Sequence, residues 1–373
     1  MQVCYKGFYG LNHSWSVVSQ NISRSLINLG HSLDVFSTNG IDKIPNDLIK
    51  NVIGYVENDS KLIGNTLKDN YDVSLSYTAM KNFPQYLQHS KKNRFGIWTF
   101  EFDGKNALPS GFAKNHIYCD KILPPSKFAK QVFSNSGIPE NKMTVISHGI
   151  NLNEIDSAEP YKLKTNKSTK ILINLGQIHR RKNLSGALDM FGKAFSKKDD
   201  VCLILKIQDK TPQFNFELSF SYIYKEFISK YPNHAEVEII RDFIPNIYSL
   251  YKSCDITFSP SNCEGFGMVP MEGMACGLFP IASNYGGWLD YLDDNNSLLI
   301  NGNEFKVPSN YLYYEQKSGT IAFKPFEDDG IEKLKFAVGN VDKLKEKTIS
   351  NINNIKEKYN WIEITKQILK LVK

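Results

Sequence analysis

Two glutamates eight positions apart, Glu264 and Glu272, are the side chains of this sequence best placed to do chemistry together. They lie in the segment SPSNCEGFGMVPME, residues 259–272. An apolar stretch leads into it at residues 256–258, and Pro270 stands where the first turn of a helix tolerates a missing amide donor. We therefore predict a strand, a loop and a helix start. Glu264 would precede the helix and Glu272 would lie inside it, so both carboxylates can line one cleft.

The turn between the two glutamates has the character of an anion site. The backbone amides near Gly265, Phe266 and Gly267 would point at whatever lies over the helix N-terminus, where the helix dipole favours a phosphate. This arrangement suits a sugar nucleotide, because one carboxylate would accept hydrogen bonds from sugar hydroxyls and the other from a ribose diol. In the alternative interpretation, both acids only stabilise the helix dipole and the glycines only serve the turn.

A second cluster of charged residues follows another expected strand. The sequence ILINLG runs into QIHRRKN, which places Arg180, Arg181 and Lys182 directly before a helix expected to start at residue 183 or 184. Three cations beside a helix N-terminus are disfavoured by the dipole, so they need a compensating partner. A bound diphosphate would supply that partner. The alternative is a solvated basic turn.

The size and composition predict a globular protein of two domains. A chain of 373 residues is long enough for two cores, and 41% hydrophobic content can fill them. No run of eighteen apolar residues occurs, and the start MQVCYKGFYG enters a strand-like pattern without a signal peptide, so we expect a soluble, cytoplasmic protein. The net charge of +6 is compatible with anionic ligands or with peripheral contact to an acidic membrane surface. No nucleic-acid-binding motif is visible, so we expect no nucleic-acid partner.

The cysteines show no pattern of ligands or disulfides. They are scattered among apolar segments without a CxxC pair or a Cys/His ligand spacing. We therefore expect no metal site, and we expect the thiols to be reduced and mostly buried. The six are Cys4, Cys119, Cys202, Cys254, Cys263 and Cys276.

Alternating β and α patterns predict an α/β protein with a doubly wound, mainly parallel sheet in each half. The expected strands are residues 2–8, 32–36, 52–56, 73–77, 95–99, 143–147, 171–175, 201–206, 237–240, 255–258 and 279–282, with helices that include 15–29 and 126–134. Residues 151–170 are polar and lack apolar periodicity. We accordingly expect a first domain at residues 1–155, a linker at 156–170, a second domain at 171–350 and a terminal helix at 351–373.

The E-x7-E spacing, with its preceding strand and PS and the following MACGLFPIASNYGG, resembles the donor-site signature of the GT-B glycosyltransferases. It is similar to the large retaining group called family 4, or glycosyl transferases group 1, over about thirty contiguous positions. The resemblance implies two Rossmann-like domains facing a central cleft, with a C-terminal helix that crosses back to the first domain. Residues 1–155 would then serve the acceptor and residues 171–350 the nucleotide-sugar donor.

The resemblance also implies roles for individual residues. Glu264 would bind donor-sugar hydroxyls, Glu272 would bind the ribose, and Arg181 and Lys182 would stabilise the departing diphosphate. The family usually has an arginine after the glycine of its phosphate loop, where this chain has Gln177. The donor-binding set implied by the resemblance is Gly10, Gln177, Arg181, Lys182, Arg241, Asp242, Phe243, Glu264, Gly265, Phe266, Gly267, Met268 and Glu272.

The acceptor side departs from the family pattern. Many members place a histidine and an aspartate near the acceptor, and this chain offers Glu101 and Asp103 there. We count Glu101 as a catalytic candidate with Glu264, Arg181 and Lys182, since a carboxylate could orient an acceptor hydroxyl; the alternative is a surface loop acid. In the loop after the first strand, Gly10 and His13 are candidates to approach the donor diphosphate.

The implied activity is metal-independent, retaining transfer of a hexosyl unit from a UDP- or GDP-sugar to a hydroxyl of a glycan, glycolipid or glycoprotein, with no cofactor. Negative charge would gather on the departing diphosphate, and the acceptor proton would leave to a phosphate oxygen. Two alternatives stay open. One is a non-catalytic nucleotide-sugar-binding scaffold, and the other is a GT-B-related epimerase or phosphorylase.

Overall fold

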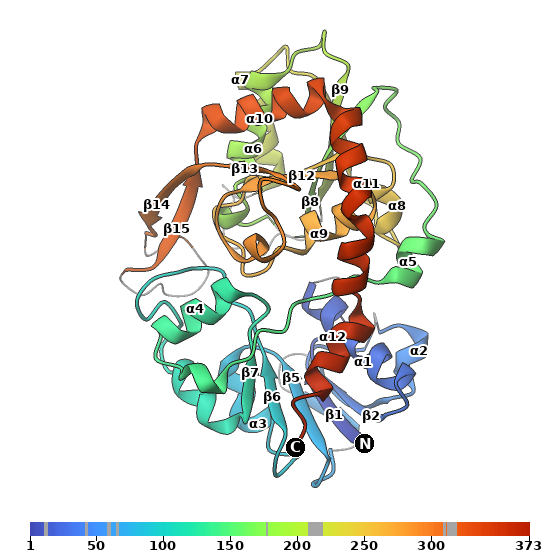
Figure 1. Ribbon diagram of the computed structural model, residues 1–373, viewed down its shortest axis with the longest axis vertical. Helices are drawn as coiled ribbons and strands as arrows, with labels where there is room; N and C mark the ends of the chain where they lie inside the picture. Colours follow the sequence, from blue (N-terminus) through green and yellow to red (C-terminus); the bar gives the residue numbers. More distant parts are fainter. Residues whose placement is uncertain are drawn as a thin grey trace. The chain divides into compact units, whose positions relative to one another are not determined.

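The computed structural model describes residues 1–10, 14–41, 44–57, 61–64, 67–176, 178–207, 219–308, 311 and 319–373. The chain divides into two compact units (Figure 1). The first consists of Met1–Phe100, Gly104–Asn151 and Lys358–Lys373, and the second of Glu101–Asp103 and Leu152–Glu357. Gln177 and His13, both named as candidates above, lie outside the described residues.

The first unit is built on a seven-stranded sheet with the order β4-β3-β2-β1-β5-β6-β7. All neighbours are parallel except β3 and β4. The interior strand β5, next to the central strand β1, is buried along its whole length, as in a sheet covered on both faces. The strands are β1 (Gln2–Gly7), β2 (Ser32–Ser37), β3 (Val52–Glu57), β4 (Lys61–Gly64), β5 (Val73–Tyr77), β6 (Arg94–Ile97) and β7 (Lys121–Leu123).

Helices from both ends of the sequence belong to this unit. They are α1 (Ser14–Asn28), α2 (Asn46–Ile49), α3 (Phe83–Tyr86), α4 (Lys127–Asn135) and α12 (Trp361–Leu369). Helix α1 buries Val18, Ile22 and Leu26 at helical spacing, as predicted. Helix α12 packs against α1, and its N-cap is Asn360, whose side chain accepts a hydrogen bond from the amide of Glu363.

The second unit contains a six-stranded parallel sheet with the order β10-β9-β8-β11-β12-β13. The chain runs outward from β8 to β10 and then returns to the other side of β8, so the switch point lies between β8 and β11. The strands are β8 (Thr169–Leu175), β9 (Val201–Ile207), β10 (Glu236–Ile240), β11 (Ile256–Ser259), β12 (Phe279–Ser283) and β13 (Leu298–Ile300). An antiparallel pair, β14 (Gly302–Lys306) and β15 (Ile321–Pro325), follows them.

Helices pack around this second sheet (Figure 1). They are α5 (Leu152–Ser157), α6 (Leu184–Ala194), α7 (Phe220–Lys230), α8 (Tyr248–Tyr251), α9 (Met268–Ala275), α10 (Glu327–Gly339) and α11 (Val341–Lys358). One face of β8 and β9 presents alternate apolar residues, among them Ile173 and Leu205, to a core shared with α6, α7 and α10. Two doubly wound units of this kind confirm the predicted fold class.

Two local expectations are wrong. Residues 143–147 do not form a strand: Met143 makes one isolated bridge to Ile122, although Met143 and Ile146 are buried as their apolar pattern suggests. The partner strand β7 is only three residues long and ends before two prolines, which limits pairing. The polar stretch 151–170 contains a helix, α5, because Ile155 supplies a buried anchor. The six cysteines are free, and five of them are buried.

Candidate functional site

The segment after β11 forms the strand, loop and helix start that the sequence predicts. Strand β11 ends at Ser259, and α9 begins at Met268 with Gly267 as its N-cap at a φ of +80°. A side chain at Gly267 would also meet Trp288, since an added Cβ would lie 2.5 Å from its ring. Glu264 therefore precedes the helix and Glu272 lies within it, and both are buried.

A second turn supports this loop from the side. The amide of Gly287 donates a hydrogen bond of 2.7 Å to the carbonyl oxygen of Glu264. A Cβ added at Gly287 would lie only 2.1 Å from the carbonyl oxygen of Gly265, so the two backbones are in direct contact. The loop is thus fixed by backbone packing, which holds its amides near the N-terminus of α9.

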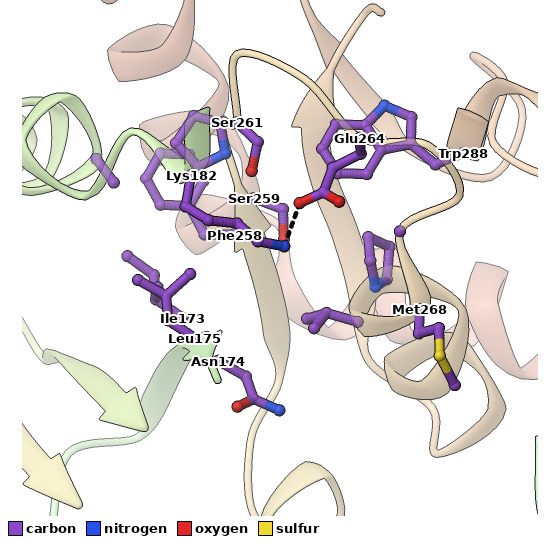
Figure 2. Close-up of a pocket in the computed structure, with 15 residues that line it drawn as sticks. Ile173, Asn174, Leu175, Lys182, Phe258, Ser259, Ser261, Glu264, Met268 and Trp288 are labelled. Atoms are coloured by element: carbon purple, nitrogen blue, oxygen red, sulfur yellow. Dashed lines mark hydrogen bonds and ion pairs between the residues drawn. The ribbon is translucent and has the colours of Figure 1, made fainter. Parts of the chain in front are cut away.

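Glu264 is the anion at the centre of a buried ion cluster. Its Oε2 lies 3.0 Å from Nη1 of Arg181, and its Oε1 is in contact with Nζ of Lys182. Figure 2 shows Lys182 and Glu264 pointing toward one another across a pocket. Arg181 also lies 3.3 Å from Oε1 of Glu101. Two carboxylates and two cations therefore neutralise one another there.

The electrostatics of the cluster keep Glu264 and Arg181 charged at neutral pH. Burial raises the pKa of Glu264, but the charges of Arg181 and Lys182 outweigh burial and hold it below its usual value. Burial lowers the pKa of Arg181, and the carboxylates of Glu264 and Glu101 more than reverse this effect. The pKa of Lys182 is lowered by burial, with Glu264 opposing the change.

The two cations come from a short turn between β8 and α6. Arg180–Lys182 form a 3-10 turn, η4, and Asn183 follows at a φ of +53° as the N-cap of α6. Nη1 of Arg181 donates to the carbonyl oxygen of Cys263 at 3.2 Å, and the carbonyl oxygen of Arg181 accepts from the amide of Asn262 at 2.7 Å. The turn is therefore tied to the Glu264 loop at both its backbone and its side chain.

Glu272 belongs to a separate hydrogen-bonded chain. Its Oε2 accepts a hydrogen bond of 2.7 Å from the hydroxyl of Tyr251, which in turn accepts one of 3.0 Å from Nδ2 of Asn174. Burial raises the pKa of Glu272 to about 7, the hydrogen bond from Tyr251 opposes the rise, and the charge of Glu154 adds to it. Glu272 therefore changes charge near neutral pH.

The pocket connects these two groups. Its lining includes Asn174 at the end of β8, Lys182, Glu264, Met268 and Trp288 (Figure 2). Its volume is about 30 Å³, enough for about two water molecules. Lys182 and Glu264, in contact with each other, thus line this small pocket beside the first turn of α9.

Three residues of the expected donor-binding set follow the end of β10, the strand at the edge of the sheet. Arg241, Asp242 and Phe243 are all exposed, and Phe243 is 67% exposed. The guanidinium of Arg241 lies over the ring of Phe220 at 5.3 Å. One exposed aromatic ring and two charged side chains therefore lie at the carboxyl end of β10.

Two further candidates lie in different units. Gly10 belongs to the first unit, where its amide donates to Oδ1 of Asn39 at 3.3 Å and an added Cβ would meet two backbone carbonyls at 2.9 Å. Glu101 belongs to the second unit, together with Asp103, whose backbone pairs with Ile321. The sequence placed residues 101–103 in the first domain, whereas the contacts group them with the ion cluster.

Sequence reasoning missed Asn174, Tyr251 and Trp288. Asn174 had a detectable signal, since it is the one amide in the apolar run ILINL. Tyr251 and Trp288 reach the site only through folding, from α8 and from the turn after β12.

The described residues contain no group of three or more His, Cys, Asp or Glu side chains that could hold a metal ion. Within the same residues, no helix is both long enough and apolar enough to cross a membrane.

Comparison with known proteins gives the class of this chain. The model of the family "Glycosyl transferases group 1" matches residues 156–311. An uncharacterized glycosyltransferase of Methanocaldococcus jannaschii is 29% identical over 190 residues, which span 49% of this chain and 46% of that protein. A glycosyltransferase structure from Rickettsia africae aligns with a TM-score of 0.72 at 18% identity, covering 100% of this chain and 97% of that one. Anabaena HepE, solved in complex with UDP and glucose, gives 0.70 at 12% identity, with 100% and 99% covered.

The structural likeness shows that the fold is GT-B, as predicted. The group 1 match spans Arg181, Lys182 and Glu264 of the ion cluster and all three residues of the Glu272 chain, while Glu101 lies outside it. The protein is accordingly a glycosyltransferase, which confirms the predicted enzyme class.

Proposed function

We propose that the protein is a metal-independent, retaining family 4 glycosyltransferase. It transfers a hexosyl unit from a UDP- or GDP-sugar to a hydroxyl of a glycan, glycolipid or glycoprotein acceptor. The observation that carries the proposal is the pair of buried cations, Arg181 and Lys182, closed on Glu264 beside the N-terminus of α9.

A diphosphate matches the charge and the position of this pair. Lys182 and the first turn of α9 line one small space, and Arg181 meets it through Glu264, which now supplies the neutralising negative charge. A donor diphosphate would replace Glu264 as the partner of Arg181 and Lys182. The released carboxylate would then accept hydrogen bonds from hydroxyls of the donor sugar, while Glu272 would accept them from the ribose.

The same groups support the reaction. As the bond between the anomeric carbon and the diphosphate oxygen breaks, the electron pair moves to the diphosphate and positive charge develops on the sugar ring. Arg181, Lys182 and the amides near Gly267 stabilise the growing negative charge in a site shielded from water. The acceptor oxygen forms the new bond on the face that the diphosphate leaves, and its proton goes to a phosphate oxygen.

The role of Glu101 follows from its contact with Arg181. Its carboxylate contacts Nη2 of Arg181, whereas Nη1 of Arg181 donates to the carbonyl oxygen of Cys263. Such a contact would keep Arg181 oriented while Glu264 leaves the two cations and binds hydroxyls of the donor sugar. The complex of Anabaena HepE with UDP and glucose supports a nucleotide sugar as the ligand class.

Donor binding and transfer test the proposal separately. Calorimetric titration with UDP- and GDP-hexoses should show binding to the wild type, and NMR of the product should show the donor's anomeric configuration. Glu264→Gln should keep nucleotide binding and lose at least about 100-fold in transfer. Glu327→Gln, at a half-exposed glutamate paired with Lys193, is the matched control and should behave as wild type. Binding of no nucleotide sugar, or an inverted product, would refute the proposal.

A further inference from the structure

Lys206 is a buried lysine in a strand whose other residues are apolar. It lies on β9, the sequence VCLILKI, and is 6% exposed. Its neighbours Leu205 and Ile207 face the core shared with α6 and α7. Lys206 therefore points to the opposite face of the sheet. The register of the two strands pairs it with Asn174 on β8, which faces the same way.

The ammonium of Lys206 is poorly satisfied by the protein. Within the described part of the chain, its hydrogen-bond partner is the carbonyl oxygen of Ile207 at 3.5 Å, a long contact for a group with three donors. Burial lowers the pKa of Lys206, and the carboxylate of Asp242 opposes the change. Burying an ammonium with so little compensation is costly, so an acceptor brought by a ligand would be bound well.

The order of the strands indicates which part of a nucleotide would meet this ammonium. The loop after β11 and the N-terminus of α9 form the proposed phosphate site. The chain Glu272–Tyr251–Asn174 leads from α9 to the end of β8 and marks the proposed ribose site. Strand β9 comes next, about 4.8 Å further along the sheet. A nucleotide held at these two points extends its base toward Lys206.

We propose that Lys206 reads the nucleobase of the donor by donating a hydrogen bond to a carbonyl oxygen on its outer edge. An ammonium only donates, so it pairs with the keto group of uracil or guanine and leaves the amino group of cytosine or adenine unpaired. The chain thus selects donors with a keto base. This inference rests on the proposed function, because it takes the ligand to be a nucleotide sugar.

The sharpest test uses pairs of nucleotides that differ mainly at this edge. Calorimetry measures the binding of UDP, CDP, GDP and ADP to the wild type, to Lys206→Met and to Lys193→Met. Lys193 is an exposed lysine near the end of α6 and serves as the control. The wild type and the control should bind UDP at least about tenfold more tightly than CDP, or GDP more tightly than ADP. Lys206→Met should lower the affinity for the keto-base nucleotides, so that UDP and CDP, or GDP and ADP, bind with affinities that differ by less than about threefold.

Other outcomes overturn the inference. If Lys206→Met lowers the affinity for all four nucleotides equally, Lys206 contacts the phosphates and not the base. If the ratio of keto-base to amino-base affinity is unchanged in the variant, Lys206 does not read the base. A wild type without base preference would also refute the inference, whereas a wild type that binds no nucleotide would refute the proposed function itself. Methionine keeps an unbranched apolar stem, is one heavy atom shorter than lysine and removes a buried charge, so Lys206→Met should melt no lower than wild type, which a thermal scan verifies.

Discussion

The hydroxyl of Tyr251 donates a 2.7 Å hydrogen bond to the carboxylate of Glu272, and both groups are buried within the second unit. A carboxylate in this setting has one hydrogen-bond donor and little water, so it takes up a proton more readily than it would in solvent. Its pKa of about 7 makes the proposed ribose contact the pH-sensitive element of the site.

The stability of the protein should therefore depend on Glu272 above pH 4.5. The folded state holds a proton on Glu272 up to about pH 7, while the unfolded state releases it near 4.5. Stability falls as pH rises between these values, and the rise in pKa corresponds to about 3 kcal/mol at pH 8. In urea unfolding, Glu272→Gln should match wild type at pH 4 and exceed it at pH 8. A difference between the two proteins that stays constant with pH would contradict this.

Donor affinity should show the opposite trend with pH. A ribose diol donates its hydrogen bonds to the ionised carboxylate, so the affinity for a nucleotide sugar should fall about tenfold for each pH unit below 7. Nucleotide sugars are the right probe, because they lack a terminal phosphate that titrates in the same range. A 2′,3′-dideoxy analogue should bind with a flat profile. If both ligands show the same pH dependence, Glu272 does not hold the ribose.

Removing the charge of Glu264 should make the stability of the protein depend more strongly on nucleotide binding. Glu264→Gln leaves Arg181 and Lys182 buried with Glu101 as their only carboxylate in the cluster, so we expect a loss of about 3 kcal/mol in unfolding free energy. A nucleoside diphosphate restores the missing charge, so UDP or GDP should raise the melting temperature of the variant more than that of the wild type. An equal or smaller shift in the variant would show that the cations do not hold the phosphates.

Glu101 should act through Arg181. Glu101→Gln is expected to raise KM for the donor several-fold and to change kcat less, because the guanidinium loses one of its two carboxylate partners. Arg181→Lys should also weaken donor binding, since one ammonium cannot bridge both carboxylates. A different pattern, with unchanged donor KM and a kcat that loses its dependence on pH, would instead make Glu101 a base for the acceptor.

Much of the candidate site in the second unit could be predicted from local sequence. The order strand, loop and helix around Glu264 and Glu272 follows from Pro270, the glycines and the apolar run before them, all within one segment. The position of Arg181 and Lys182 before α6 is equally local.

Contacts between distant segments could not be predicted. Glu101 meets Arg181 eighty positions later, and Asn174 on β8 meets Tyr251 on α8, so each pairing depends on the packed fold. The strand predicted at residues 143–147 does not form for a related reason: an alternating apolar pattern forms a strand only when the neighbouring strand is long enough to pair with it.

The helix α12 gives the first unit an unusual assembly order. This unit combines residues up to Asn151 with Lys358–Lys373, and Trp361 of the later segment contacts Gly149 so closely that an added Cβ there would lie 2.8 Å from its ring. A ribosome delivers that segment only after the whole second unit has emerged. The second unit can therefore begin to fold before α12 is available, while the first unit lacks this helix until then and the side of α1 that α12 covers stays exposed.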